Sequence, residues 1–364
     1  MTGTTAGTLD GELAEFDHLF VNVLDWLPGL WDRERGGFYY ALSSTGASEF
    51  EADIESTAFA VNIIARAGLL GSLPRAVRTA LVRFFQDRQD RRSGYFLDPQ
   101  NEMREIERLR GRALDMATSA LARLGAEPLY PLPDPGTGAT AYTRHVESVD
   151  AFEEWLDQRP WENSWLAQDN IQAQAALLML LPDSRRDALV GTAIRYVSAR
   201  QDPVTGFAGE GVPYNRLSGA FKFALFCRQV GHAVPRAREI YDAAFEVIRT
   251  QECTDACWLR NPVELIDVVG AQLGGVGERD VAELVRITTA NSRGFARDDG
   301  GFSRHLGHSL EAPNEVRLGF GLDEGDLNAT HQFVTTVRPT LYRLAGVAAP
   351  ALSIPDGWAD RFQA

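Results

Sequence analysis

Two acidic stretches of this chain combine residue types that can exchange protons with a substrate. Asp53 and Glu55 stand ahead of a small, apolar segment, and Asp326 precedes His331 in a segment of similar composition. A carboxylic acid that is shielded from water can donate a proton, and a histidine can accept one. These four residues are therefore the candidate catalytic groups.

Each stretch also has a structural interpretation. Aspartate is a favoured N-cap, so Asp53 could cap a helix that begins at Ile54. The polar spacing after Asp326 echoes that after Asp53, and the two acids could be equivalent caps of repeated helices. An extended backbone would project Asp53 and Glu55 to one side, whereas a helix would separate them by about 200°. His331 could equally be an interior histidine with its hydrogen bonds satisfied.

Basic residues form a second candidate site. Arg108 and Arg112 are one helical turn apart, so they share a face and could clamp phosphate oxygens. Further candidates for binding the same substrate group follow later in the chain: Tyr214, Arg216 and Lys222. Lys222 is the only lysine and stands in an apolar segment, where a charge needs a partner. That partner could be a substrate diphosphate or an interior acid such as Asp169 or Asp267.

Aromatic residues could line a substrate cavity. Trp165, Trp258 and Phe302 stand at helix starts or in the loops before them. Their ring faces could stabilise carbocations by about 0.5–2 kcal/mol each. Packing between helices is the alternative role of each ring.

Short glycine-aromatic turns, each followed by a segment rich in small residues, organise the rest of the chain. The turns are Gly37-Phe38, Gly94-Tyr95, Gly206-Phe207 and Gly301-Phe302. A periodicity of this kind is typical of repeated helical pairs. We therefore expect an all-α protein built from six pairs of helices.

The first helix of each expected pair is amphipathic and suits an outer layer, and the second is more evenly apolar and suits an inner layer. The outer helices are expected at about 10–31, 74–91, 146–158, 184–201, 235–251 and 278–292. The inner helices are expected at about 53–69, 105–124, 163–181, 215–231, 260–274 and 325–345. Together they predict an (α/α)6 toroid forming a single domain over residues 1–364, with long loops at about 126–145 and 293–323.

Two motifs resemble those of a known superfamily. The segments 89–95 and 201–207 resemble the Gln…Gly-x-Trp repeat of squalene and related terpenoid cyclases, with Tyr or Phe in place of Trp. The segment 53–58 resembles the Asp-x-Asp-Asp-Thr-Ala motif of class II terpene cyclases, in which Ser56 replaces the third acid. The chain is thus similar to the terpenoid cyclase and protein prenyltransferase superfamily over nearly its whole length.

This resemblance implies a class II-like terpenoid cyclase of isoprenoid metabolism with a small-molecule prenyl substrate. Glu55, helped by Asp53, would protonate the chain, and His331 would remove the final proton. The basic residues Arg108, Arg112, Arg216 and Lys222 would hold a polar or diphosphate head. A diphosphate would make Mg2+ a plausible cofactor, because the ion bridges such oxygens to carboxylates.

Two other functions fit the same expected fold. A carbohydrate-active toroid (an epimerase, glycosidase or lyase) would use Asp53, Glu55 and Asp326 as acids and would have a polar cavity throughout. A non-catalytic lipid- or peptide-binding toroid would keep its ligand after Glu55→Gln or Asp326→Asn.

Composition excludes several classes of protein. The chain is 45% hydrophobic with a formal net charge of −14, which argues against nucleic acid as a partner. It has no apolar stretch long enough for a membrane span and no secretory signal at Met1–Leu9. Three cysteines suit a reducing cytoplasm, and Cys253 and Cys257 have no clear histidine partner for a metal.

Overall fold

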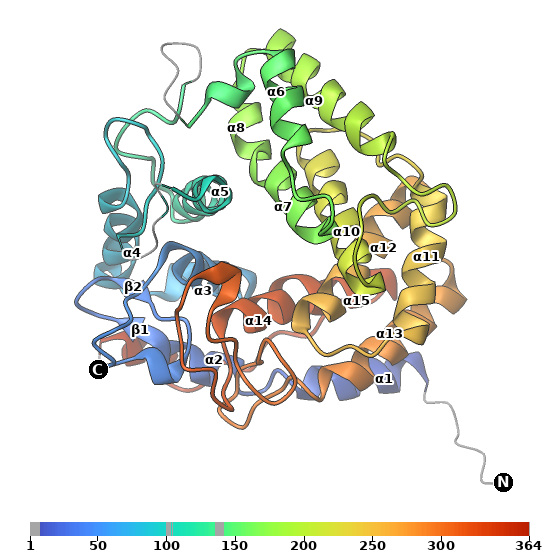
Figure 1. Cartoon of the computed structure of the whole chain (residues 1–364). Coiled ribbons are helices and arrows are strands. Elements are labelled where there is room, and N and C mark those ends of the chain that lie inside the picture. Colours follow the sequence, from blue (N-terminus) through green and yellow to red (C-terminus); the bar gives the residue numbers. More distant parts are fainter. Residues whose placement is uncertain (1–7, 100–102, 104, 135–141, 364) are drawn as a thin grey trace, which may run out of the picture. The chain divides into compact units, whose positions relative to one another are not determined.

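The computed structural model describes residues 8–99, 103, 105–134 and 142–363. Within these ranges the backbone is mostly helical (Figure 1). The named strands there are β1 (Trp31–Asp32) and β2 (Gly37–Phe38), an antiparallel pair with Trp31 opposite Phe38. The predicted all-α class is confirmed.

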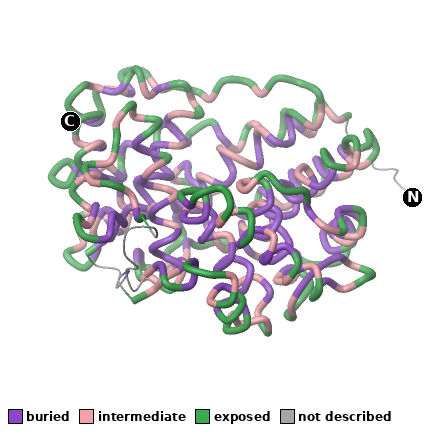
Figure 2. Tube along the Cα trace, turned by 90° about the horizontal axis from the view of Figure 1, so that it is seen from above, coloured by how far each residue is buried: buried purple, intermediate pink, exposed green. Residues whose placement is uncertain are grey.

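Helices occupy each of the expected outer and inner segments. The outer segments contain α1 (Leu9–His18), α2 (Val23–Trp26), α4 (Arg75–Asp87), α6 (Val149–Asp157), α9 (Asp183–Ser198), α11 (Ala237–Thr250) and α13 (Glu278–Ser292). The inner segments contain α3 (Ile54–Arg66), α5 (Glu107–Arg123), α7 (Ser164–Ala173), α8 (Ala175–Met179), α10 (Pro213–Gln229), α12 (Ala256–Gln272), α14 (Leu327–Gln332) and α15 (Arg338–Leu344). Buried residues run along the helices, and exposed residues concentrate in the connecting loops (Figure 2).

Three expected helices are interrupted: 10–31 between α1 and α2, 163–181 between α7 and α8, and 325–345 between α14 and α15. The segment 10–31 ends in a 3-10 turn over Leu27–Leu30, with Pro28 in its first turn. The segment 325–345 contains a π-helical turn over Phe333–Val337 between α14 and α15. Pro339, at the start of α15, cannot donate to the carbonyl one turn earlier, and the wider turn accommodates that gap.

The segments 126–145 and 293–323 lie between α5 and α6 and between α13 and α14. The loop at 126–145 ends in a 3-10 turn over Arg144–Val146, and its residues 135–141 lie outside the described chain. The loop at 293–323 carries a 3-10 turn over Pro313–Glu315.

Tertiary contacts divide the chain into two compact units. Unit 1 comprises Met1–Arg78, Glu252–Asp267 and Gly275–Ala364, and unit 2 comprises Thr79–Gln251 and Val268–Gly274. In unit 1, α1 packs against α13 and α3 packs against α14. The core of this unit includes Phe302, whose ring centroid lies 5.0 Å from that of Phe20 and 4.2 Å from that of Phe333.

In unit 2, α7 packs against both α5 and α10. Glycine permits these close approaches because it has no Cβ. A Cβ on Gly111 of α5 would lie 2.2 Å from the Ala173 carbonyl oxygen, and one on Gly219 of α10 would lie 2.1 Å from the Ser164 hydroxyl oxygen. Any larger residue would force α7 away from its neighbours.

The glutamines of the two resemblance motifs hold their turns in the same way. The side-chain amide of Gln89 donates to the Gly94 carbonyl at 3.2 Å, and that of Gln201 donates to the Gly206 carbonyl at 2.8 Å. Gly206 has a φ of +68°, and a Cβ there would come within 2.7 Å of Ile240. The motif residues therefore fix each turn, the first against the loop at Tyr130–Pro133 and the second against α11, which is a structural role.

Candidate functional site

The two predicted acids Asp53 and Asp326 occupy equivalent helix caps in unit 1. Asp53 accepts from the Ser56 N–H at the start of α3, and Asp326 accepts from the Ala329 N–H at the start of α14, both at 2.8 Å. The exposed fractions of these aspartates are 1% and 0%. Capping thus accounts for one hydrogen bond of each acid.

Threonines four residues after the caps bind the preceding turns in matching fashion. The Phe38 N–H donates to the Thr57 hydroxyl oxygen at 2.9 Å. The Phe302 N–H donates to the Thr330 hydroxyl oxygen at the same distance. Because both the caps and these threonine contacts coincide, the two acidic stretches occupy matching positions in two helical repeats.

Asp326 makes a second hydrogen bond, and burial shifts its pKa. Its second carboxylate oxygen accepts from the Arg304 backbone N–H at 2.7 Å. Burial raises the pKa of Asp326 to about 7, against the opposing effects of the Ala329 and Arg304 N–H groups and the Arg304 charge. The carboxyl is therefore partly protonated at neutral pH, although it has no exposed surface through which a substrate could contact it.

Glu55 projects from the first turn of α3 and is half-buried. The Asn314 side-chain amide donates to its two carboxylate oxygens, at 3.1 and 3.3 Å. Since Asp53 is an extended N-cap and α3 begins at Ile54, Asp53 is enclosed while Glu55 keeps part of its surface exposed. Of the two acids in this stretch, Glu55 is the one that a substrate can reach.

A line of residues on α3 connects Glu55 with His331 of α14. Glu55, Phe59 and Asn62 are spaced by four and three residues and therefore share one helix face. The Phe59 ring stacks on the His331 ring, with centroids 4.3 Å apart and planes 20° apart. The Asn62 amide nitrogen lies 3.4 Å from His331 Nε2. We call Glu55, Phe59, Asn62 and His331 the α3–α14 face.

Unit 1 also contains a set of polar groups that the sequence did not indicate. The Arg304 guanidinium donates to Asp255 at 2.7 Å and to the Asn328 side chain at 3.3 Å. Burial lowers the pKa of Arg304, but the Asp255 carboxylate and the neighbouring Cys257 and Tyr40 together outweigh that effect and hold the pKa above its usual value. No sequence motif connects these residues, because they come from three separate segments.

In unit 2, three predicted basic residues surround one acid. Asp169 of α7 is fully buried, and its carboxylate oxygens lie 2.7 Å from Lys222 Nζ, 3.2 Å from Arg108 and 3.5 Å from Arg112. Burial alone would raise the pKa of Asp169, but Lys222, Arg112 and Arg108 together hold it well below its usual range. Asp169 is one of the interior partners that the sequence suggested for Lys222.

The other predicted binding residues are distributed over both units. Tyr214 is buried in α10, and Trp165 lies under Arg108, whose guanidinium carbon is 5.7 Å from the Trp165 ring centroid. Trp258 is half-buried on α12, and Phe302 is in the core of unit 1. Arg216 lines a separate cavity of about 430 Å³ in unit 2.

Within the described chain, the histidine, cysteine and carboxylate side chains form no group of three or more that could hold a metal ion. Both oxygens of Asp169 already contact cations, so this carboxylate does not fit the Mg2+ ion that a diphosphate would bring.

The helices of the described residues include none long and apolar enough to cross a membrane.

Comparison with known proteins identifies the fold. The α-1,6-mannanase GH76A from Salegentibacter sp. has a TM-score of 0.51 at 12% identity, over 90% of this chain and 99% of that one. A variant of the type II terpene cyclase MstE from Scytonema, in complex with geranylgeranyl dihydroxybenzoate, has a TM-score of 0.50 at 12% identity, over 92% and 99%. This chain has the (α/α)6 toroid fold.

The same comparisons do not select one activity. No protein-family model matches the chain, and the search of curated proteins gave no match. The similar toroids include a glycoside hydrolase and a terpene cyclase, and at this identity their likeness concerns the fold alone.

Proposed function

We propose that this protein is an enzyme that begins and ends a carbocation reaction on an apolar, unsaturated substrate, as a class II-like terpenoid cyclase does. The observation that carries the proposal is the α3–α14 face. There a reachable carboxyl (Glu55), an aromatic ring (Phe59) and a histidine (His331) follow one another on two packed helices.

Glu55 is the proton donor in this proposal. An apolar substrate that covers the Glu55 carboxyl excludes water from the place where the proton is transferred. The proton adds to one carbon of a double bond, the π electrons form the new C–H bond, and the other carbon becomes cationic. A second double bond then attacks this cation, which closes a ring and moves the positive charge along the chain.

Phe59 and His331 act on the later steps. The Phe59 ring offers a π face to the cation, an interaction worth about 0.5–2 kcal/mol. His331 takes a proton from the carbon next to the final cation, and the electrons of that C–H bond form a new double bond. One proton enters and one leaves, so the reaction is an isomerisation that needs no oxidant or reductant.

An anion-binding role for unit 2 is a separate element of the proposal. Arg108, Arg112 and Lys222 bring three positive charges to the one carboxylate of Asp169. Such a cluster favours the binding of an anionic substrate group, by the bidentate geometry of arginine and the point charge of lysine. Phosphate binding to Arg112→Gln, compared with the wild type, tests this role without reference to Glu55.

A carbohydrate-active enzyme is the second candidate, and the polar set of Arg304, Asp255 and Asn328 favours it. Hydrolysis of a glycosidic bond commonly needs two carboxyl groups on either side of that bond. Asp53 and Asp326 are enclosed caps, which leaves Glu55 as the reachable acid of the three that the sequence suggested. The cyclase therefore ranks first.

The deciding experiment is turnover in D2O. The protein is incubated with farnesyl diphosphate, geranylgeranyl diphosphate and geranylgeranyl dihydroxybenzoate, with and without Mg2+, and the products are analysed before and after phosphatase. We expect a cyclised product that keeps its polar head and carries one deuterium on carbon. Glu55→Gln should abolish it, whereas Glu34→Gln, at an exposed position, should not. Turnover of an oligosaccharide panel with none of the prenyl substrates would reverse the ranking.

A further inference from the structure

The aromatic residues of the four glycine-aromatic turns have different surroundings. Phe38 lies against Trp31, with ring centroids 5.1 Å apart, and against Phe362 at 6.2 Å. Phe302 lies against Phe20 and Phe333. Within the described chain, Phe207 has no aromatic ring beside it and borders the cavity of about 430 Å³ instead. The Phe207 turn thus lacks the neighbouring aromatic ring that the equivalent turns at Phe38 and Phe302 have.

The turn at Tyr95 shows what occupies the corresponding place. The Tyr142 ring lies edge-on to Tyr95, with centroids 5.8 Å apart. The guanidinium carbon of Arg110 lies 4.0 Å from the centroid of the same Tyr142 ring. In this repeat, an aromatic side chain of the protein is therefore held between the turn aromatic and an arginine.

Arg216 occupies the position in its repeat that Arg110 occupies in the other. Arg110 is the fourth residue of α5, and Arg216 is the fourth residue of α10. Its guanidinium carbon lies 6.0 Å from the Phe207 ring centroid, and both residues line the cavity. The same arginine and turn aromatic are present, but the ring that corresponds to Tyr142 is missing among the described residues.

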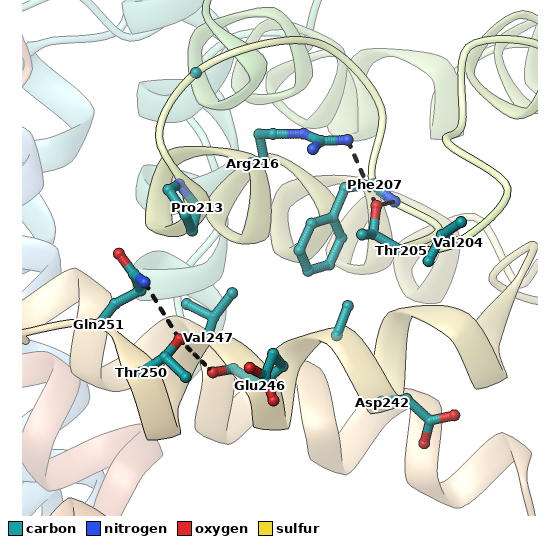
Figure 3. A pocket seen from close by; sticks show the side chains of 12 residues that line it. Val204, Thr205, Phe207, Pro213, Arg216, Asp242, Glu246, Val247, Thr250 and Gln251 are labelled. Atoms are coloured by element: carbon teal, nitrogen blue, oxygen red, sulfur yellow. Dashed lines mark hydrogen bonds between the residues drawn. The ribbon is translucent and has the colours of Figure 1, made fainter.

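The walls of the cavity suit an aromatic molecule. Val247, Ala243, Pro213 and Phe207 supply apolar surface, and the volume lies within the range of small-molecule sites. Arg216 and Phe207 project from one side of the cavity, and α11 closes the other (Figure 3). A ring in this space would contact apolar groups on one face and a guanidinium on the other.

The polar groups define the rest of the ligand. Arg216 donates to the Thr205 hydroxyl at 3.5 Å, while its buried Nε–H has no acceptor in the part of the chain that is described. A buried donor without an acceptor is unfavourable, so an acceptor on the ligand would stabilise the site. Asp242 and Glu246 are exposed on α11 and also line the cavity, and their charges disfavour a ligand with more than one negative charge.

We infer that this cavity is a binding site for a small aromatic monocarboxylate. The aromatic ring contacts both Phe207 and Arg216, as Tyr142 contacts both Tyr95 and Arg110, and the carboxylate accepts from the Arg216 Nε–H. The site lies wholly within unit 2, and the inference does not depend on the proposed cyclase activity.

The test measures binding of 1-naphthoate to the full chain by isothermal titration calorimetry, with cyclohexanecarboxylate as the equally charged, non-aromatic control. We expect saturable binding of one naphthoate per chain, and binding of the control weaker by about tenfold or more. Arg216→Gln should weaken naphthoate binding by a similar factor. Arg228→Gln, which changes an exposed arginine of α10 that does not line the cavity, should leave it unchanged.

Two variants that fill or block the cavity complete the test. Ala243→Phe places a protein ring in the cavity and should abolish naphthoate binding. Thr250→Trp, at an exposed lining position, blocks the cavity without changing a buried residue, and it serves if Ala243→Phe does not fold. The inference is overturned if the wild type shows no saturable binding, if both carboxylates bind equally, or if naphthoate binds the folded filling variants as tightly as the wild type.

Discussion

Phe59 of α3 stacks on His331 of α14, with ring centroids 4.3 Å apart. The contact joins two helices whose capping aspartates are equivalent in the repeat but whose neighbouring polar side chains differ. Two residues after the cap Asp53, α3 carries the reachable acid Glu55. The matching residue of α14, two positions after Asp326, is Asn328, which contacts Arg304. The two repeats thus share a similar backbone arrangement, and different side chains give each of them its own chemistry.

Glu55→Gln should lower the rate of the proposed cyclisation by at least about 10²-fold, because the amide cannot supply the proton. The melting temperature should stay within about 2 °C of the wild type, since Glu55 is half-buried and Asp53 still caps α3. Product analysis and thermal unfolding of the same preparations check the two parts. Full activity of the variant would exclude Glu55 as the donor.

His331→Asn should change the products more than the rate of protonation. Without the base, the final cation loses its proton elsewhere or is captured by water, which gives new alkene isomers or an alcohol. His331→Phe is the matched second variant, because it keeps a ring against Phe59 but cannot accept the proton. Identical product mixtures from His331→Asn and the wild type would contradict the assignment of His331 as the base.

Asp326→Asn should change how stability depends on pH. The folded state raises the pKa of Asp326 from 3.8 to about 7, so it binds the proton more tightly than the unfolded chain does. The contribution of this group to the free energy of unfolding is therefore largest below about pH 4 and decreases as the pH rises to about 7. A shift of this size corresponds to at most about 4 kcal/mol.

The measurement is urea unfolding at pH 5 and pH 8. Asparagine retains the helix cap but does not titrate. Relative to the wild type, the variant should therefore be more stable at pH 8 than at pH 5. A difference between the two proteins that is the same at both pH values would mean that Asp326 does not titrate in this range.

Asp169→Asn should destabilise the protein by about 3–5 kcal/mol, because it leaves buried cations without their carboxylate. Lys222 contacts the same carboxylate at 2.7 Å, so the double variant with Lys222→Gln should recover part of the loss. Chemical unfolding of both variants provides the comparison. Additive losses in the double variant would show that Asp169 and Lys222 are not coupled.

The sequence by itself determined the helical pairs and the glycine-aromatic turns, and it offered Asp53 and Asp326 as helix caps beside their possible role as acids. These features depend on local physics: the period of apolar residues, the preference of aspartate for N-caps, and the positive φ of turn glycines such as Gly206. Boundaries shifted where Pro28 and Pro339 removed backbone donors.

Only the tertiary structure decided which charges meet and which acid stays within reach. Lys222 had several possible partners in the sequence, and the packing of α7 against α10 brings it to Asp169. Asp53 and Glu55 look alike in the sequence, yet the start of α3 at Ile54 encloses one and leaves the other half-exposed. Contacts between distant segments depend on the packing of whole helices, and a local pattern carries no information about that packing.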